Sequence, residues 1–336
     1  MMRPILGITM GDAAGVGPEV IVKALADEKL YESSRPVVFG DKKIMERAVK
    51  IVGSTLACRS IESPEDGGIQ YGTIDIVDLD NLPADLPFAK LDARAGKAAY
   101  EYVEAAVKYA MQHKVHAIVT APLNKEALHM GGCPYPGHTE ILGALMGQKD
   151  YSMMLVSEPL KVIHVSTHVS LRDACDLVKK ERVLKVIELA DETVKLMGIK
   201  KPHIAVAGLN PHSGEHGMFG TEDDEEILPA VKMAVEKGID VQGPIPPDSV
   251  FHRAAIKREF DIVVVMYHDQ GHIPLKVLGF ETGVNVTVGL PCIRTSVDHG
   301  TAFPVAGQGI ADSRSMTEAL NLGAQMANVK FAELLK

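Results

Sequence analysis

The sequence has few cysteines, and no two of them stand at C-x-x-C spacing. Its four cysteines, Cys58, Cys133, Cys175 and Cys292, are separated by wide and irregular gaps. Such gaps give no sign of a disulfide framework and favour free thiols in a reducing compartment. The predicted location of the protein is therefore the cytoplasm.

Apolar runs of membrane length are also absent. The apolar run at residues 5–10 is too short for a signal peptide or a membrane helix and fits a first strand. The chain carries 44 acidic and 35 basic residues, and its net charge of −9 repels nucleic acid and anionic membranes. We expect neither as a partner, and an anionic substrate would need a local cationic pocket.

The glycine-rich loop after the first predicted strand lacks both common phosphate-binding patterns. Gly11, Gly15 and Gly17 do not form G-x-G-x-x-G, and no Lys-Ser/Thr of a P-loop follows them. Pro18 and Glu19 are typical of a tight turn from a strand into a helix. The favoured interpretation is a structural turn, and a Rossmann fold is not predicted.

Strand-like and helix-like segments alternate along the 336 residues, which predicts an α/β protein large enough for two lobes. No internal repeat or low-complexity linker separates the lobes, so short crossings must join them. Several predicted strands are continuously apolar, as in sheets covered on both faces. The predicted strands are 5–10, 36–40, 73–79, 117–121, 152–156, 161–166, 203–209, 262–267 and 284–290, and the predicted helices are 95–112, 180–197, 223–237 and 315–335.

Three histidines follow three predicted strands. His168, His212 and His268 would lie at the carboxyl ends of these strands, where function gathers in open α/β sheets. Three imidazoles with an open position make a workable divalent-metal site. Each also has a second histidine four residues away, but that spacing shares a face only in a helix, and we expect loops around residues 210–220 and 268–274. One metal bound by one histidine from each strand is favoured over three two-histidine sites, and spacing alone leaves it balanced against three separate structural histidines.

Several other polar groups are candidates for binding an anion. His138 and Thr139 follow Gly137 at a predicted helix start, where free N–H groups attract phosphate or carboxylate, although a plain N-cap by Thr139 is the alternative. Lys276 and Arg294 could grip the same groups, with Arg294 in a predicted loop at residues 289–296. Surface charge is the alternative for Lys276.

Asp248, Asp269 and Lys125 are candidates for proton transfer. Asp269 follows His268 directly and could orient a metal-bound imidazole or act as a base. Asp248 could equally cap a helix, and Lys125 could be a solvated lysine in a first helical turn.

Five motifs together resemble the 4-hydroxythreonine-4-phosphate dehydrogenase (PdxA) family, and they keep the family's order along nearly the whole chain. The motifs are TMGDAAGVGPE at residues 9–19, YPGHTE at 135–140, NPHSGE at 210–215, MYHDQG at 266–271 and RTSVDHGTA at 294–302. The resemblance implies two α/β/α lobes similar to the isocitrate and isopropylmalate dehydrogenases. Residues 1–135 and 296–336 would form a cofactor-side lobe, and residues 136–295 a metal- and substrate-side lobe. It also implies a homodimer with its active sites at the interface.

The resemblance also implies roles for individual residues. His168, His212 and His268 would bind the divalent metal (Zn, Mg, Mn or Co). NAD or NADP would bind at the loop after residue 297. The implied substrate ligands are His138, Thr139, Lys276, Asn285 and Arg294, and the implied cofactor ligands are Asp298, His299, Gly300 and Thr301.

Three departures from the commonest pattern resemble a second branch of the family, the 4-phospho-D-threonate and 4-phospho-D-erythronate dehydrogenases. Ala13 replaces a usual proline, His272 stands where an apolar residue is usual, and residues 121–126 fit the second branch. The resemblance implies oxidation of the 3-hydroxyl and then decarboxylation to dihydroxyacetone phosphate. The alternative is the 4-phosphooxy-L-threonine dehydrogenase of pyridoxal phosphate synthesis.

Two rival classes of function stay open. Three histidines with Asp269 would also suit a metal-dependent hydrolase, which would release phosphate without a nicotinamide cofactor. A metal- or phosphate-binding protein without catalysis would bind such ligands without turnover.

Overall fold

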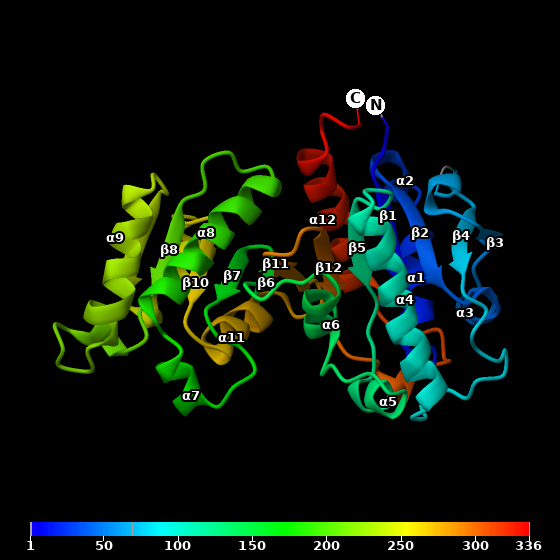
Figure 1. The fold of residues 1–336 in the computed structure, drawn as a ribbon, viewed down its shortest axis with the longest axis horizontal. Helices are drawn as coiled ribbons and strands as arrows, with labels where there is room; N and C mark the ends of the chain where they lie inside the picture. The colour runs from blue at the N-terminus through cyan, green and yellow to red at the C-terminus, as the bar shows by residue number, and fades with distance from the viewer. Residues whose placement is uncertain (1, 69, 336) are drawn as a thin grey trace. The chain divides into compact units, whose positions relative to one another are not determined.

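The computed structural model describes residues 2–68 and 70–335 and divides the chain into two compact units. Unit 1 comprises Met1–Lys149 and Leu290–Lys336, and unit 2 comprises Asp150–Gly289. In each unit, strands form a sheet layer and helices cover it, as Figure 1 shows. The predicted α/β fold class is confirmed. Within the described residues, no helix is both long and apolar enough to cross a membrane.

Unit 1 contains a parallel sheet with strands in the order β3-β4-β2-β1-β5-β12. Strands β1, β5 and β12 are wholly buried, as expected where helices cover both faces of a sheet. Helices α1, α3 and α12 pack together on one side, and α4, α5 and α6 pack together elsewhere on the unit. The strands are β1 (Ile5–Thr9), β2 (Arg35–Gly40), β3 (Ala57–Ile61), β4 (Thr73–Asp78), β5 (Ala117–Thr120) and β12 (Ile293–Val297), and the helices are α1 (Gly17–Leu25), α2 (Leu30–Ser33), α3 (Lys42–Val52), α4 (Ala93–Met111), α5 (Lys125–Met130), α6 (His138–Leu145) and α12 (Arg314–Lys330).

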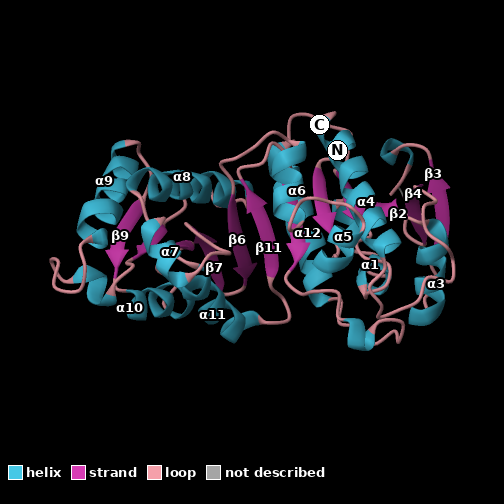
Figure 2. Cartoon of the chain, turned by 60° about the horizontal axis from the view of Figure 1, so that its bottom comes forward, coloured by secondary structure: helices cyan, strands magenta, loops and turns pink. Residues whose placement is uncertain are grey.

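Unit 2 contains a mixed sheet in the order β11-β6-β7-β10-β8-β9. Strand β6 runs antiparallel to both of its neighbours, whereas β7, β10, β8 and β9 are parallel. Helices α8 and α9 pack together, and α10 and α11 lie apart from them (Figure 2). The strands are β6 (Ser152–Ser157), β7 (Leu160–His164), β8 (Ile204–Ala207), β9 (Val241–Ile245), β10 (Ile262–Val265) and β11 (Val284–Val288), and the helices are α7 (Leu171–Asp176), α8 (Lys180–Leu196), α9 (Leu228–Glu236), α10 (Pro247–Phe251) and α11 (His268–Gly279).

The boundaries between the units differ from the predicted ones at 135/136 and 295/296. Helix α6 packs against α4, and β12 pairs in parallel with β5, so both segments belong to unit 1. His138, Thr139 and Arg294 therefore belong to unit 1, and the three candidate metal ligands belong to unit 2.

Some elements were missed in the sequence. Strands β3 and β9 are short edge strands, and β12 was predicted as a loop because Arg294 and the flanking prolines and glycines interrupt its apolar run. Residues 268–274 were predicted as a loop but form the start of α11, which tolerates Pro274 within the helix. The prediction was wrong because proline usually ends a helix.

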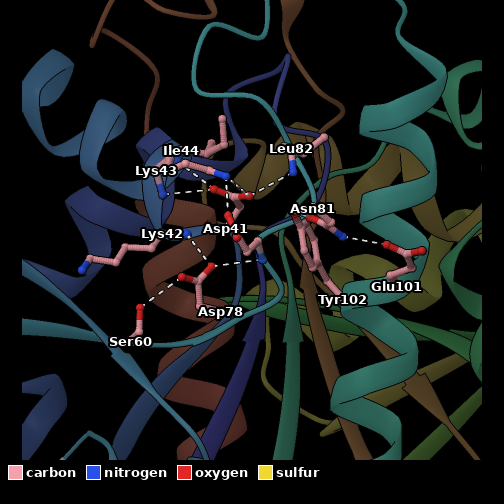
Figure 3. A network of polar contacts seen from close by, with 11 residues as sticks. Asp41, Lys42, Lys43, Ile44, Ser60, Asp78, Asn81, Leu82, Glu101 and Tyr102 are labelled. Carbon is pink, nitrogen blue, oxygen red and sulfur yellow. Dashed lines mark hydrogen bonds and ion pairs between the residues drawn. The ribbon is translucent and has the colours of Figure 1, made fainter.

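A polar network fixes the loop that follows β4 in unit 1 (Figure 3). The buried Asp41 carboxylate accepts hydrogen bonds from the N–H groups of Lys43 (3.0 Å) and Ile44 (3.4 Å), and so caps α3. Its other oxygen accepts from the Leu82 N–H at 3.0 Å. One side chain therefore holds the start of a helix and a distant loop together.

The same loop is tied to α4 by a second chain of hydrogen bonds in Figure 3. The hydroxyl of Tyr102, whose side chain is buried, donates to Asn81 Oδ1 at 2.8 Å, and Asn81 Nδ2 donates to Glu101 Oε2 at 2.7 Å. The loop is thus held from two helices.

We predict that Asp41→Ala destabilises the protein by about 2–4 kcal/mol, because it removes a helix cap and leaves buried N–H groups unpaired. Asp80→Ala, which removes an exposed partner of Lys43, should cost less than about 0.5 kcal/mol. Urea unfolding followed by circular dichroism measures both. Equal effects of the two variants would contradict the proposed role of Asp41.

Candidate functional site

The three candidate metal ligands follow three neighbouring parallel strands of unit 2. His168 follows β7, His268 follows β10 and His212 follows β8, and the three strands stand side by side in the order β7-β10-β8. The carboxyl ends of parallel strands open on the same edge of a sheet, where ligands bind in α/β proteins.

His168 and His268 line one cleft of about 450 Å³. Their ring centroids are 5.8 Å apart. The Nδ1 atom of His268 lies 2.6 Å from Asp269 Oδ1, so its N–H faces the carboxylate and its Nε2 keeps a lone pair. The lining residues are Thr167, His168, Val169, Ser170, Leu171, Ala174, Tyr267, His268 and Asp269.

The structure does not place His212 in this cleft. Its ring lies near Phe219, with centroids 6.1 Å apart. Among residues 2–68 and 70–335, no three His, Cys, Asp or Glu side chains are grouped so that they could hold a metal ion. The structure therefore brings His168 and His268 together, and His212 stands in a separate turn.

That turn has an unusual backbone. Residues 212–217 all have positive φ, at 54, 55, 78, 44, 57 and 87°, and four of them are not glycine. Left-handed helical backbone costs roughly 1–2 kcal/mol per L-residue, so other contacts must hold it. The buried Asp223 carboxylate holds the start of the turn by accepting from the N–H groups of Leu209 (2.9 Å) and Asn210 (3.1 Å). Strain of this kind gathers at functional sites.

Unit 1 contains a cationic group in a buried setting. Arg294 belongs to β12, is 3% exposed, and donates from Nη2 to Thr120 Oγ1 at 2.7 Å. Burial lowers its pKa to about 10. Burial, aided by the charge of Arg294, also lowers the pKa of His138 well below its usual value, so His138 is neutral. Its Nε2 atom is buried, with no hydrogen-bond partner among the described residues.

The start of α6 lies beside this group. Gly137 is the N-cap, and no side chain caps the helix within the described chain, so the alternative of a plain N-cap by Thr139 is wrong. Lys125 is exposed at the start of α5, and its Cε lies near Gly137. Unit 1 therefore brings the guanidinium of Arg294, the imidazole of His138 and the side chain of Lys125 to the start of α6.

Hydroxyl groups form a row that sequence reasoning missed. The register pairs Thr120 of β5 with Thr9 of β1 and with Ser296 of β12. Thr9 and Thr120 are the last residues of their strands, and Ser296 is the last but one. Thr9 Oγ1 is buried without a partner in the part of the chain that the structure describes. The available signal was a polar residue at the end of each of three apolar strands.

The remaining candidates lie on separate elements. Lys276, in α11, has its ammonium group 5.3 Å from the centroid of the Phe280 ring, and Asn285 is in β11. Asp248 is exposed in the first turn of α10, whose N-cap is Pro246, so the alternative that Asp248 caps this helix is wrong.

The loop expected to bind the cofactor is fastened to α1. The Val16 N–H donates to the Thr301 carbonyl at 3.0 Å, and a Cβ on Gly15 would lie only 2.8 Å from Thr301, so glycine is required for this approach. The buried Glu19 carboxylate accepts from the N–H groups of Gly307 (2.6 Å) and Gly309 (2.7 Å). Gly15, Val16 and Glu19 therefore all help to hold the chain from Thr301 to Gly309 against the start of α1.

Within the loop itself, polar atoms are available to a ligand. The Asp298 N–H donates to Ser315 Oγ at 3.1 Å. His299 Nδ1 lies 2.9 Å from the Gly300 carbonyl, and its Nε2 is buried with no partner among the described residues. A Cβ on Gly300 would meet no atom within 4 Å, so the loop is open at this point.

Comparison with known protein families identifies the family of this chain. The family described as pyridoxal phosphate biosynthetic protein PdxA matches residues 32–323. The chain belongs to the PdxA family. The PdxA motifs recognised in the sequence are thus confirmed as signs of family membership.

Relatives within the PdxA family extend this result over almost the whole chain. A D-threonate 4-phosphate dehydrogenase from Cupriavidus necator is 54% identical over 325 residues, 96% of this chain and 97% of the relative. A crystal structure of a 4-hydroxythreonine-4-phosphate dehydrogenase from Burkholderia phymatum is 54% identical, covers 97% of this chain and 99% of its own, and has a TM-score of 0.87. A terephthalate 1,2-cis-dihydrodiol dehydrogenase from Burkholderia xenovorans LB400 is 30% identical, covers 96% and 98%, and has a TM-score of 0.70. The predicted class of enzyme, an oxidoreductase acting on a CH–OH group, is confirmed.

One further acid in the first PdxA motif has an unusual setting. Asp12 is 1% exposed, and its Oδ1 accepts from the Ala14 N–H at 2.8 Å. Its Oδ2 is buried without a partner within the described residues. Burial raises the pKa of this carboxyl to about 6.

We predict that Asp12 makes the protein less stable as the pH rises. The folded state favours the protonated carboxyl, so this contribution is complete below pH 4 and is lost as the pH rises through about 6. Relative to the wild type, Asp12→Asn should gain about 2–3 kcal/mol in free energy of unfolding between pH 4 and pH 7. Urea unfolding at each pH measures this, with the exposed Asp27→Asn as control. A constant difference across that range would show that Asp12 is not perturbed.

Proposed function

We propose that this protein oxidises the 3-hydroxyl of 4-phospho-D-threonate with NAD or NADP, and that the resulting 3-keto acid loses its carboxylate as carbon dioxide to give dihydroxyacetone phosphate. The observation that carries this proposal is the 54% identity, over 96% of the chain, to a D-threonate 4-phosphate dehydrogenase. 4-Phospho-D-erythronate, which differs only in configuration at one hydroxyl, is the nearest related substrate.

Two imidazoles of unit 2, those of His168 and His268, have the chemistry to bind a divalent cation. His268 has its Nδ1–H directed at Asp269, which leaves Nε2 available as a ligand, the arrangement common at metal-bound histidines. His168 lines the same cleft, and with His212 these residues would hold Zn, Mg, Mn or Co. When bound, such a cation lowers the pKa of a coordinated hydroxyl and stabilises the negative charge that develops on decarboxylation.

The charged groups supply binding of the anionic substrate. In unit 1, Arg294, the neutral His138 and the N–H groups at Thr139 offer hydrogen bonds to phosphate or carboxylate. In unit 2, Lys276 and Asn285 offer a point charge and an amide. These donors explain how a chain of net charge −9 holds an anion.

A nicotinamide cofactor fits the loop from Asp298 to Thr301. The buried Nε2 of His299 lacks a partner within the described chain, and Gly300 leaves space for a close approach. When bound, the nicotinamide accepts the hydride from the substrate carbon. Lys125 and Asp248 are the exposed groups that we propose as acceptors of the hydroxyl proton, while Asp269 orients His268.

A second candidate substrate is 4-phosphooxy-L-threonine, which carries an amino group in place of the 2-hydroxyl. The structure from Burkholderia phymatum, whose name refers to that substrate, is also 54% identical to this chain. Identity alone does not separate the two substrates, so both belong in the assay.

The activity is tested by following absorbance of the reduced nicotinamide with a divalent metal, NAD or NADP, and each of the three substrates. Reduction with 4-phospho-D-threonate that a chelator abolishes is the expected result. His212→Ala should lower turnover at least 10³-fold while the circular dichroism spectrum stays unchanged, because a lost metal ligand removes the charge that activates the hydroxyl. Phosphate release without reduction of either nucleotide would instead support a metal-dependent hydrolase, and reduction only with 4-phosphooxy-L-threonine would reassign the substrate.

We further propose that the enzyme is a cytoplasmic homodimer with its active sites at the interface. Apolar side chains on α11 support this: Ile273, Val277 and Phe280 are 60%, 80% and 66% exposed and recur at helical spacing. A stripe of exposed apolar residues is typical of a protein–protein interface. The four free thiols suit a reducing cytoplasm.

Val277→Glu should convert the dimer to a monomer and lower activity at least tenfold, because it places a charge within an apolar contact. Val235→Glu, at an exposed apolar site on α9, is the matched control and should leave the mass unchanged. Light scattering after gel filtration measures both. A dimer that persists in Val277→Glu would place the interface elsewhere.

A further inference from the structure

Two buried imidazoles lie directly behind His268 in unit 2. His164, the last residue of β7, is fully buried, and His272, in the first turns of α11, is 8% exposed. The rings of His268 and His272 stack with centroids 3.6 Å apart and planes 12° apart. His268 and His272 are four residues apart in one helix, which places both side chains on the same face.

The hydrogen bonds fix which nitrogen carries the proton on each of these rings. His164 Nδ1 lies 3.0 Å from the Met153 carbonyl, which only accepts, so this nitrogen carries the proton. His272 Nδ1 lies 3.0 Å from the His268 carbonyl, so it too carries a proton. The same Nδ1 is 3.1 Å from His164 Nε2, which must therefore be the acceptor. His272 thus donates to both β7 and its own helix.

A glycine makes this packing possible. Gly271 precedes His272, and a Cβ there would lie 2.7 Å from His164 Nε2 and 2.8 Å from Val265 Cγ2. Such distances do not occur in folded proteins, so any larger residue would push α11 away from β7 and β10. The contact between His272 and His164 therefore depends on the close approach of the helix to the sheet.

Two contacts then define the orientation of the His268 ring. Asp269 Oδ1 accepts from His268 Nδ1, with the two atoms 2.6 Å apart, and the ring of His272 stacks on one face of the His268 ring. We propose that His272 is a positioning residue, which with His164 holds His268 so that Nε2 is presented to the cleft. This inference rests on the proposed role of His268 as a metal ligand. It extends that role to a histidine with no place in the mechanism derived above.

The contribution of His272 should appear in metal affinity. Partners that orient a metal-bound histidine from behind typically contribute 10- to 100-fold to affinity. His272→Leu removes both the stacked ring and the N–H donor and should weaken binding of Co²⁺ by that factor. His272→Phe keeps a flat ring and should recover part of the loss, and it also serves if His272→Leu fails to fold.

The control is the same substitution at a second stacked histidine of unit 2. His203 stacks on Phe260, with centroids 4.9 Å apart, and does not line the cleft. His203→Leu should leave the Co²⁺ affinity within twofold of the wild type. Binding is followed by the visible absorption of Co²⁺ added to metal-free protein, and thermal unfolding reports the stability of each variant.

A second readout does not require metal. In ¹⁵N-histidine-labelled protein, the ring nitrogen shifts should show His268 with the proton on Nδ1, facing Asp269. In His272→Leu this proton should exchange with water faster than in the wild type, because the ring is held less firmly against the carboxylate. Wild-type affinity together with an unchanged exchange rate in His272→Leu would overturn the positioning role and leave the metal site standing. Absence of Co²⁺ binding by the wild type would overturn the metal site itself, and with it the positioning role.

Discussion

A strand that is buried on both faces can place polar side chains cheaply only where it ends, and this constraint shapes both units. In unit 2, β10 and β8 are apolar throughout, β7 is apolar apart from Lys161 and its last residue, and the candidate histidines follow the ends of these strands. In unit 1, Thr9, Thr120 and Ser296 stand in one row for the same reason. Arg294 is an exception, because it lies within β12, and its burial is tolerated with a hydroxyl oxygen at 2.7 Å. The position of the Arg294 guanidinium is therefore set by the backbone of β12 and by the surrounding core.

His268 and His212, both in unit 2, are held in place by different interactions. His268 is held by packing, since Gly271 lets α11 approach the sheet and the rings of His272 and His164 fill the space behind. His212 is held by hydrogen bonds, since Asp223 must keep the preceding residues in place before a left-handed turn. Packing tolerates little displacement, whereas a strained turn stores free energy that a bound ligand can draw upon. The cleft therefore has a closely packed wall at His268, and His212 belongs to a strained turn.

The central strands could be predicted from the sequence, because continuous runs of Val and Ile are typical of strands buried on both faces. The candidate histidines were expected to follow strand ends, and they do follow β7, β8 and β10. Prediction failed at β12 and α11, where Arg294 and Pro274 each violate a local rule and tertiary contacts outweigh the penalty. The orientation of the His268 ring could not be predicted, because it depends on Met153, His164 and His272, which meet only in the folded chain. Roles of single residues came from family resemblance, and spacing alone left each of them with a structural alternative.

The attachment of the segment from Thr301 to Ala311 has a consequence for how it behaves. Val16, Glu19 and Lys23, which follow one another along a single face of α1, each hold a backbone atom of this segment. Because these hydrogen bonds recur along the segment, we expect it to move together with α1 and not as a separate loop. Its conformational entropy is lost when the chain folds, so a ligand that binds there meets a surface already in order. Motion at this place would have to carry the first helix with it, and the loop cannot act as an independent flap.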